Sequence, residues 1–159
     1  MDEALRAAAI VCAKYGLIVS VLALLYGLRR FLHAWELWSL VAGAATAAAI
    51  TFLAGHSVHH VRPFVSLHVV PPIPHAADNG FPSDHSVAAA YIAAWLWFYD
   101  KPGALLASAA ALAIGCARVY CLLHLPSDVA AGFLIGALPG IFAAAVSRRT
   151  SPRAGAADV

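Results

Sequence analysis

The sequence predicts an all-α integral membrane protein that folds as a bundle of about five transmembrane helices. Of its 159 residues, 62% are hydrophobic and only 11% are charged, whereas soluble domains carry about 25% charged residues. Five apolar stretches each have the length that crosses a hydrocarbon core of about 30 Å as a helix; they cover residues 7–28, 37–54, 82–99, 104–123 and 127–146. This composition excludes a disordered chain, a basic nucleic-acid binder and an ordinary water-soluble enzyme.

Each apolar stretch has features that fit a membrane span. The first follows an acidic N-terminus, where a cleaved secretory signal would be basic, so we expect it to be retained. Its Lys14 must face the bundle or extend to the interface. The second stretch is rich in alanine and threonine, and the fourth follows Lys101 and ends just before His124. Pro82 and Pro126 stand at the starts of the third and fifth stretches, where the missing N–H of proline costs a helix nothing.

Three glycines recur at every fourth position of the fifth stretch, at Gly132, Gly136 and Gly140. Small residues at this spacing let helices approach each other closely in lipid. The glycine face either packs against another helix of the same chain, which we favour, or forms the seam of a homodimer. The sequence does not otherwise predict an oligomeric state.

The basic residues predict how the chain is oriented in the membrane. If all five stretches cross, six of the ten Lys/Arg residues fall on one side, and these are Arg29, Arg30, Lys101, Arg148, Arg149 and Arg153. Because basic loops stay cytoplasmic, we expect the N-terminus outside and the C-terminus in the cytoplasm. The long loop 55–82 then faces the periplasm or the cell exterior. We expect one transmembrane domain over residues 1–149 and a short polar tail at 150–159.

The remaining ionisable residues gather in three clusters on the predicted outer side. They are His59–Pro63, Phe81–Ser86, and a third group of Arg118, His124, Pro126, Ser127 and Asp128. Charged side chains at membrane depth are costly and by default mark a functional site. Arg62 and Arg118 offer fork-shaped donors to phosphoryl oxygens. Helices that begin at Pro82 and Pro126 would also aim free backbone N–H groups at an anion.

The same clusters contain groups for nucleophilic chemistry. His124 and Asp128 are four residues apart across a helix start, so Asp128 can accept a hydrogen bond from Nδ1 and leave Nε2 of His124 as the nucleophile. His85, on another helix, can supply the proton that a leaving oxygen needs. Ser83 adds a hydroxyl to the phosphate site, or serves only as a helix N-cap. Together the clusters predict a site that binds a phosphate and transfers it.

These residues resemble the motifs of the type 2 phosphatidic acid phosphatase superfamily of membrane lipid phosphatases. The matching elements are Arg62-Pro63, then Pro82-Ser83-Asp84-His85, then Arg118-x5-His124-x3-Asp128. The resemblance covers about residues 55–140. The stretch from Ile73 to His85 is especially similar to the undecaprenyl-diphosphate phosphatase branch.

The resemblance implies a hydrolase of a bacterial inner membrane that needs no metal or other cofactor. Its partners would be the bilayer and a lipid phosphate, with undecaprenyl diphosphate favoured as the substrate, and no nucleic acid. It implies that His124 forms a phosphohistidine, that Asp128 orients His124, and that His85 acts first as acid and then as base. The phosphate would be bound by Arg62, Arg118, Ser83 and the backbone of Asp84.

The chain departs from the family's first motif. The lysine that the family has seven residues before the arginine is Gly55 here, followed by His56. Two alternatives are open: a histidine such as His56 or His60 takes its place, or the site relies on two arginines alone. Ala117 also stands where the family often has serine, and the family commonly has six spans where we count five.

The same residues allow other interpretations. The substrate could be phosphatidylglycerol phosphate, phosphatidic acid or a lipid A phosphate, and a protein of another class would bind or transport phospholipids without catalysis. The run from His56 to His60, with His68 and His75, allows a zinc site. Few carboxylates and no cysteine lie nearby, so solvated interfacial histidines are favoured. Asp78 and Asn79 are expected to form a turn rather than to bind substrate.

Overall fold

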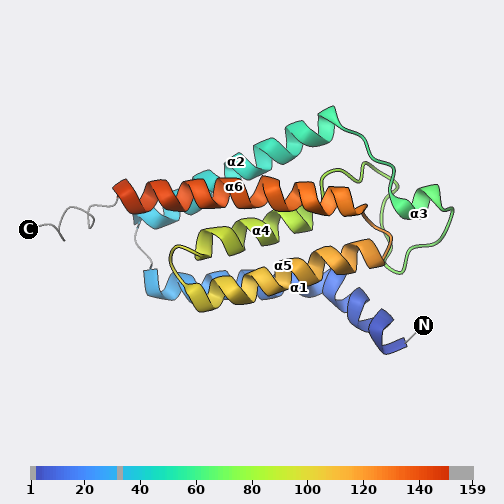
Figure 1. Cartoon of the computed structure of the whole chain (residues 1–159), viewed down its shortest axis with the longest axis horizontal. Coiled ribbons are helices and arrows are strands. Elements are labelled where there is room, and N and C mark those ends of the chain that lie inside the picture. The colour runs from blue at the N-terminus through green and yellow to red at the C-terminus, as the bar shows by residue number, and fades with distance from the viewer. Residues whose placement is uncertain (1–2, 32–33, 151–159) are drawn as a thin grey trace, which may run out of the picture.

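The computed structural model describes residues 3–31 and 34–150, and over this part of the chain its regular elements are all helices. They are α1 (Glu3–Phe31), α2 (Ala34–Ser57), α3 (Pro63–Ser66), α4 (Asp84–Leu96), α5 (Lys101–Tyr120) and α6 (Pro126–Thr150). The long helices run back and forth along one axis, and the α2–α4 connection, which contains α3, forms one end of the molecule (Figure 1). The all-α prediction is confirmed. From position 151 onward, the predicted polar tail lies outside the described residues.

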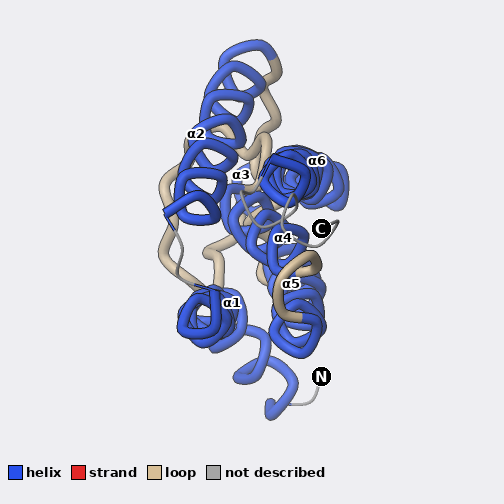
Figure 2. Tube along the Cα trace, turned by 90° about the vertical axis from the view of Figure 1, so that its left-hand side faces the viewer, coloured by secondary structure: helices blue, strands red, loops and turns tan. Residues whose placement is uncertain are grey.

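Four of the described helices are long and apolar enough to cross a membrane: α1, α2, α5 and α6. The third predicted span is wrong in length, because the 13 residues of α4 extend only about 20 Å at roughly 1.5 Å per residue. α4 instead packs against α1, α2, α5 and α6 at the centre of the bundle (Figure 2). The apolar run at 82–99 therefore reflects burial inside the protein, since a helix that is apolar on every side is surrounded by other helices.

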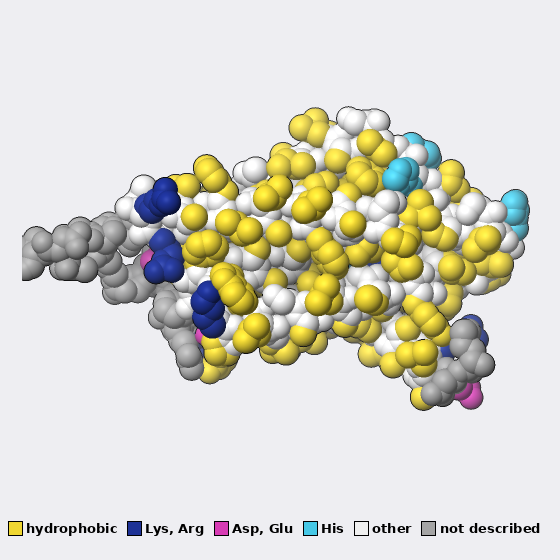
Figure 3. All heavy atoms as spheres, in the orientation of Figure 1, with side chains coloured by type: hydrophobic (Ala, Val, Ile, Leu, Met, Phe, Trp, Pro, Cys, Tyr) yellow, Lys and Arg dark blue, Asp and Glu magenta, His cyan; other side chains and the backbone are white. Residues whose placement is uncertain are grey.

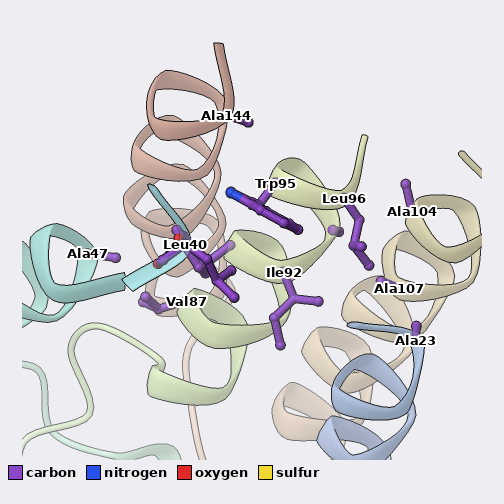
Figure 4. Packing of buried hydrophobic residues seen from close by; sticks show 12 residues of the cluster. Ala23, Leu40, Ala47, Val87, Ile92, Trp95, Leu96, Ala104, Ala107 and Ala144 are labelled. Carbon is purple, nitrogen blue, oxygen red and sulfur yellow. Dashed lines mark hydrogen bonds between the residues drawn. The ribbon is translucent and has the colours of Figure 1, made fainter. Parts of the chain in front are cut away.

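The core around α4 combines large side chains on α4 with small ones on the neighbouring helices. Trp95 is buried, and its Nε1 donates a hydrogen bond to Oγ of Ser39 on α2 at 3.2 Å. Leu96 points the other way, toward Ala104 and Ala107 of α5 (Figure 4). Alanine at these positions lets the neighbouring helices approach α4 closely. This packing holds the short central helix in place and so positions its first turn.

The three glycines of α6 pack directly against the backbone of α4. A Cβ atom at Gly132 would lie 2.8 Å from the carbonyl oxygen of Ser83, and one at Gly140 would lie 2.8 Å from that of Tyr91. Real Cβ atoms do not come so close to backbone, so these positions require glycine. The structure thus places the glycine face in an intramolecular contact, which is the alternative that we favoured, and fixes the start of α4 against α6.

Charged residues divide between the two ends of the molecule (Figure 3). Lys101, Arg148 and Arg149 are exposed at the end where α5 begins and α6 stops, whereas histidines are visible toward the opposite end. Lys14 is exposed on α1, so it does not face the bundle, and extension to the interface is the placement that remains. Which end of the molecule is cytoplasmic stays a prediction.

Candidate active site

Side chains from separate segments of the chain meet at the end of the bundle that holds the α2–α4 connection. Arg62 and Ser83 take the N-cap positions of α3 and α4, and Arg118 lies in the last turn of α5. His124 precedes α6, and Asp128 lies in its first turn. All five are buried, and the most exposed of them, Arg62, is only 6% exposed. Because ionisable side chains are seldom buried without partners or a function, this end of the bundle is the candidate active site.

The ring of His124 is oriented by the backbone of the α2–α4 connection. Its Nδ1–H donates to the carbonyl oxygen of Gly80 at 2.8 Å. Because a carbonyl can only accept, the proton sits on Nδ1 and the lone pair on Nε2. Nη2 of Arg118 lies 3.0 Å from Nε2, and Nη1 of Arg62 lies 3.3 Å from it. The lone pair of His124 therefore faces the two guanidinium groups that are suited to hold a phosphate.

The surroundings of His124 keep its ring neutral. Its pKa falls to about 4, first because the ring is buried and then because Arg118 and Arg62 are positive, although the Gly80 carbonyl and Asp128 oppose this. A solvated histidine has a pKa of about 6.5. The neutral form, which alone has a lone pair for nucleophilic attack, therefore predominates at neutral pH. It is lost only as the pH falls through about 4.

Asp128 does not make the contact that the sequence predicted. Its Oδ2 is 3.9 Å from Nδ1 of His124, too far for a hydrogen bond. Oδ2 instead accepts the N–H of Leu125 at 2.7 Å, and Oδ1 accepts a hydrogen bond from Nδ1 of His60 at 2.6 Å. The physical reason is that the α2–α4 connection brings the Gly80 carbonyl to Nδ1 of His124. The Asp128 carboxylate then binds the backbone at the start of α6.

Arg62 is held in place by three hydrogen bonds. Its Nε donates to Oδ1 of Asp78 at 2.8 Å, Nη1 to the Leu123 carbonyl at 2.9 Å and Nη2 to the Asn79 carbonyl at 3.1 Å. Burial raises the pKa of the Asp78 carboxyl, but the hydrogen bond and the charge of Arg62 outweigh burial and bring this pKa below its ordinary value. Asp78 thus anchors an arginine of the site, a role that its interpretation as a turn residue missed.

Arg118 is positively charged, and one of its N–H donors has no hydrogen-bond partner in the described structure. Its Nη2 donates to Nε2 of His75 at 3.3 Å as well as to His124. Its buried Nε finds no hydrogen-bond partner within residues 3–31 and 34–150. A buried N–H group without a partner is costly, and a phosphoryl oxygen would supply one. The arrangement of Arg118 therefore fits its predicted role of binding an anion.

The first turn of α4 carries the other predicted residues. Ser83 is buried, its hydroxyl makes no capping bond to α4, and its N–H donates to the backbone carbonyl of Asp128 at 3.1 Å. The starts of α4 and α6 are thus joined at the site. Asp84 is exposed and His85 is half-buried. In the described structure no hydrogen bond links His85 to His124, so a bound phosphate would have to connect them.

The histidines outside the matched motifs have different surroundings. His60 lies within the site, whereas His56 is exposed and its Nδ1 donates to a carbonyl of its own helix at 2.8 Å. Sequence reasoning named His75 only for a possible zinc site and missed its place beside the nucleophile: its ring centroid is 6.4 Å from that of His124 and its Nε2 contacts Arg118. The available signal was its place in the stretch most similar to the undecaprenyl-diphosphate phosphatase branch. Nowhere in the described ranges do three His, Cys, Asp or Glu residues form a group that could hold a metal ion.

The sequence of this chain is similar to those of known bacterial proteins. The bacitracin transport permease protein BcrC of Bacillus licheniformis is 38% identical over 88 residues, which cover 54% of this chain and 43% of that protein. The undecaprenyl-diphosphatase BcrC of Bacillus subtilis is 32% identical over 101 residues, which cover 58% of this chain and 52% of that protein. The chain spans about half the length of the curated relatives it matches.

A solved structure and a family model also match this chain. The chain is similar to the crystal structure of a transmembrane PAP2-type phosphatidylglycerolphosphate phosphatase from Bacillus subtilis, with a TM-score of 0.72 and 21% sequence identity. That similarity covers 96% of this chain and 81% of the other, and it supports a multi-pass membrane fold. The model of the PAP2 superfamily matches residues 36–151, which include every residue predicted for the site. The chain therefore belongs to the PAP2 superfamily.

Proposed function

We propose that this protein is a membrane lipid phosphatase that hydrolyses undecaprenyl diphosphate to undecaprenyl phosphate and phosphate. The observation that carries the proposal is the lone pair on Nε2 of His124, which lies between guanidinium nitrogens of Arg62 and Arg118. Membership of the PAP2 superfamily supports the reaction class. The relative from Bacillus subtilis that is named an undecaprenyl-diphosphatase supports the substrate.

In the proposed mechanism, Nε2 of His124 attacks the terminal phosphorus, and the bond to the leaving oxygen of undecaprenyl phosphate breaks. The arginines, the backbone at the start of α4 and the Ser83 hydroxyl hold the phosphoryl oxygens and the charge that develops on them. His85 gives a proton to the leaving oxygen and then takes one from water. That water attacks phosphorus, the P–N bond breaks, and neutral His124 is restored. The membrane would be the bacterial inner membrane, with the site on the periplasmic or extracellular side.

A groove beside Arg62 supports a lipid rather than a water-soluble substrate. It lies between α2 and α4, has a volume of about 600 Å³ and includes Arg62, Asp78 and Asp84 at its polar end. The rest of its wall is mainly apolar and includes Ala44, Ala47, Ala48, Phe52, Val87, Ala88 and Tyr91, together with the polar residues Thr51, His56 and Asn79. Because Arg62 belongs to both the groove and the phosphate site, a lipid bound there can place its phosphate beside His124 and its first chain segments in the groove.

The test of the proposed function is an assay of the full chain, purified in detergent, on a panel of lipid phosphates with EDTA present. Phosphate release is expected from undecaprenyl diphosphate, and vanadate should inhibit it because vanadate mimics the phosphoryl transition state. Faster release from phosphatidylglycerol phosphate, phosphatidic acid or a lipid A phosphate would change the substrate. No release from any lipid would leave a phospholipid-binding or transport protein. Loss of release in EDTA would overturn the prediction that no metal is needed.

Filling the groove is expected to discriminate against long lipid chains. Ala48→Phe should lower kcat/KM for undecaprenyl diphosphate about tenfold or more, since each buried CH₂ contributes about 0.8 kcal/mol. It should leave hydrolysis of five-carbon isopentenyl diphosphate unchanged. Ala49→Phe, on the same helix but outside the groove wall, is the matched control. Equal losses on long and short substrates would show that the groove does not hold the chain.

His85→Ala is expected to affect a monoester substrate more than a diphosphate. The leaving group from undecaprenyl diphosphate is itself a phosphate and needs little help from an acid, whereas an alkoxide leaving from phosphatidic acid needs a proton. General acids contribute roughly 10²- to 10⁴-fold. We therefore expect kcat/KM, which reports the steps through the phosphohistidine, to fall about 1,000-fold on phosphatidic acid. On the diphosphate the loss should be about 100-fold or smaller. Equal losses would contradict the assignment of His85 as acid.

A further inference from the structure

We propose that His60 is a positioning residue of this site. It fixes the Gly80 carbonyl and the Asp128 carboxylate, which lie beside Nδ1 of His124, and thereby orients the nucleophilic Nε2. The inference rests on the proposed role of His124 as nucleophile. Two separate routes through the structure lead from His60 to His124. One runs through the His60 side chain and Asp128, and the other through the His60 backbone and Gly80.

The first route begins at the His60 ring. Nδ1 of His60 donates to Oδ1 of Asp128 at 2.6 Å, and the carboxylate is completely buried. A buried carboxylate without hydrogen-bond partners destabilises the folded protein. Its other oxygen accepts the N–H of Leu125, the residue after His124, and lies 3.9 Å from Nδ1 of His124. The ring of His60 therefore holds the carboxylate in the position from which it fixes the backbone beside the nucleophile.

The second route runs through the backbone. The carbonyl oxygen of His60 accepts the N–H of Gly80 at 2.8 Å, and the Gly80 carbonyl accepts Nδ1–H of His124 at 2.8 Å. The N–H of His60 donates to Oδ1 of Asn79 at 2.9 Å, so both backbone groups of His60 bind this loop. A Cβ atom at Gly80 would lie 3.2 Å from the His60 carbonyl oxygen. The backbone segments around His60 and Gly80 therefore approach each other closely.

This placement separates His60 from the other histidines of the 56–60 run. Both groups that His60 holds lie around Nδ1 of His124, whereas the two arginines lie at Nε2. His60 thus supports the nucleophile and does not add a charge beside the phosphate. His56 bonds within its own helix, and His59 is exposed. Of the two histidines that could act in place of the absent lysine, His60 is the one built into the hydrogen-bond network of the site.

The test compares three substitutions at His60 in the full chain, with undecaprenyl diphosphate as substrate. His60→Asn keeps an N–H donor near the position of Nδ1, whereas His60→Gln moves the donor to the position of Nε2 and His60→Ala removes it. Because misplacing a reacting group by about 1 Å can cost roughly 100-fold in rate, we expect kcat to fall about 10- to 100-fold in the Ala and Gln variants. KM should change little, and the Asn variant should stay within about threefold of the wild type. His59→Ala is the matched control.

A second measurement separates positioning from general loss of structure. In protein labelled with ¹⁵N-histidine, the wild-type His124 ring should show the Nδ1–H tautomer. His60→Ala keeps the backbone route through Gly80 but loses the hold on Asp128, so it should show a smaller fraction of the Nδ1–H tautomer, which His60→Asn should largely restore. A kcat within twofold of wild type in His60→Ala, equal losses in the Asn and Gln variants, or an unchanged tautomer in His60→Ala would each overturn the proposal. The tautomer is read without substrate, so it decides on His60 even if the panel assay rejects phosphatase function.

Discussion

Replacing His124 with alanine is expected to lower phosphate release from undecaprenyl diphosphate by at least about 10⁴-fold, the range seen when an enzyme loses its nucleophile. The side chain holds the lone pair that lies between Arg62 and Arg118, and no other histidine ring in the described structure contacts both of these arginines. His124→Gln should be equally inactive, since an amide can fill the space but cannot form the phosphoenzyme. Phosphate release by each purified variant is the measurement.

A direct measurement of the intermediate accompanies this prediction. Wild-type protein quenched during turnover of substrate labelled with ³²P in the terminal phosphate should retain label in alkali and lose it in acid, as a phosphoramidate does. His124→Ala should retain none, and His59→Ala, with its exposed side chain, should match the wild type. Residual activity above about a tenth in His124→Ala, or label that resists acid, would rule out His124 as the nucleophile.

Gly136→Val is expected to destabilise the fold by about 3 kcal/mol, at the upper end of the usual effect of overpacking. A Cβ atom at Gly136 would run into the carbonyl group of Val87 and lie 3.0 Å from the N of Tyr91, both on α4. Backbone cannot move aside as a flexible side chain can, so α6 must separate from α4. The thermal midpoint of unfolding in detergent should fall by several degrees, and phosphate release should fall with it because α4 carries Ser83 and His85.

The matched control places the same residue, valine, on the exposed face of α6. Ala130→Val should leave the unfolding midpoint nearly unchanged, since the side chain at position 130 is exposed. If Gly136→Val left stability intact and instead changed the molecular mass of the particle in detergent, the glycine face would be a homodimer seam. The contact between α6 and α4 would then be less important than the structure indicates.

Local pattern was enough to locate the helices. The predicted stretches at 7–28 and 37–54 lie inside α1 and α2, and the one at 127–146 lies inside α6. Hydropathy succeeds here because a helix of about 20 apolar residues is set by its own composition in lipid. The same pattern failed for 82–99, because an apolar side chain is equally at home against lipid or against other helices. Only the packing around α4 shows that it is a short, buried helix.

The sequence by itself also determined which residue types the site would contain, since Arg62, His85, Arg118, His124 and Asp128 stand in recognisable order along the chain. The tertiary structure alone decided how these residues are connected. In the folded chain, Nδ1 of His124 donates to the Gly80 carbonyl and Nδ1 of His60 donates to Asp128. Arg118 donates to Nε2 of His75. Spacing predicts partners only within one helix turn, whereas these bonds join segments up to 68 residues apart. They depend on how the α2–α4 connection folds over the starts of α4 and α6, which no local pattern encodes.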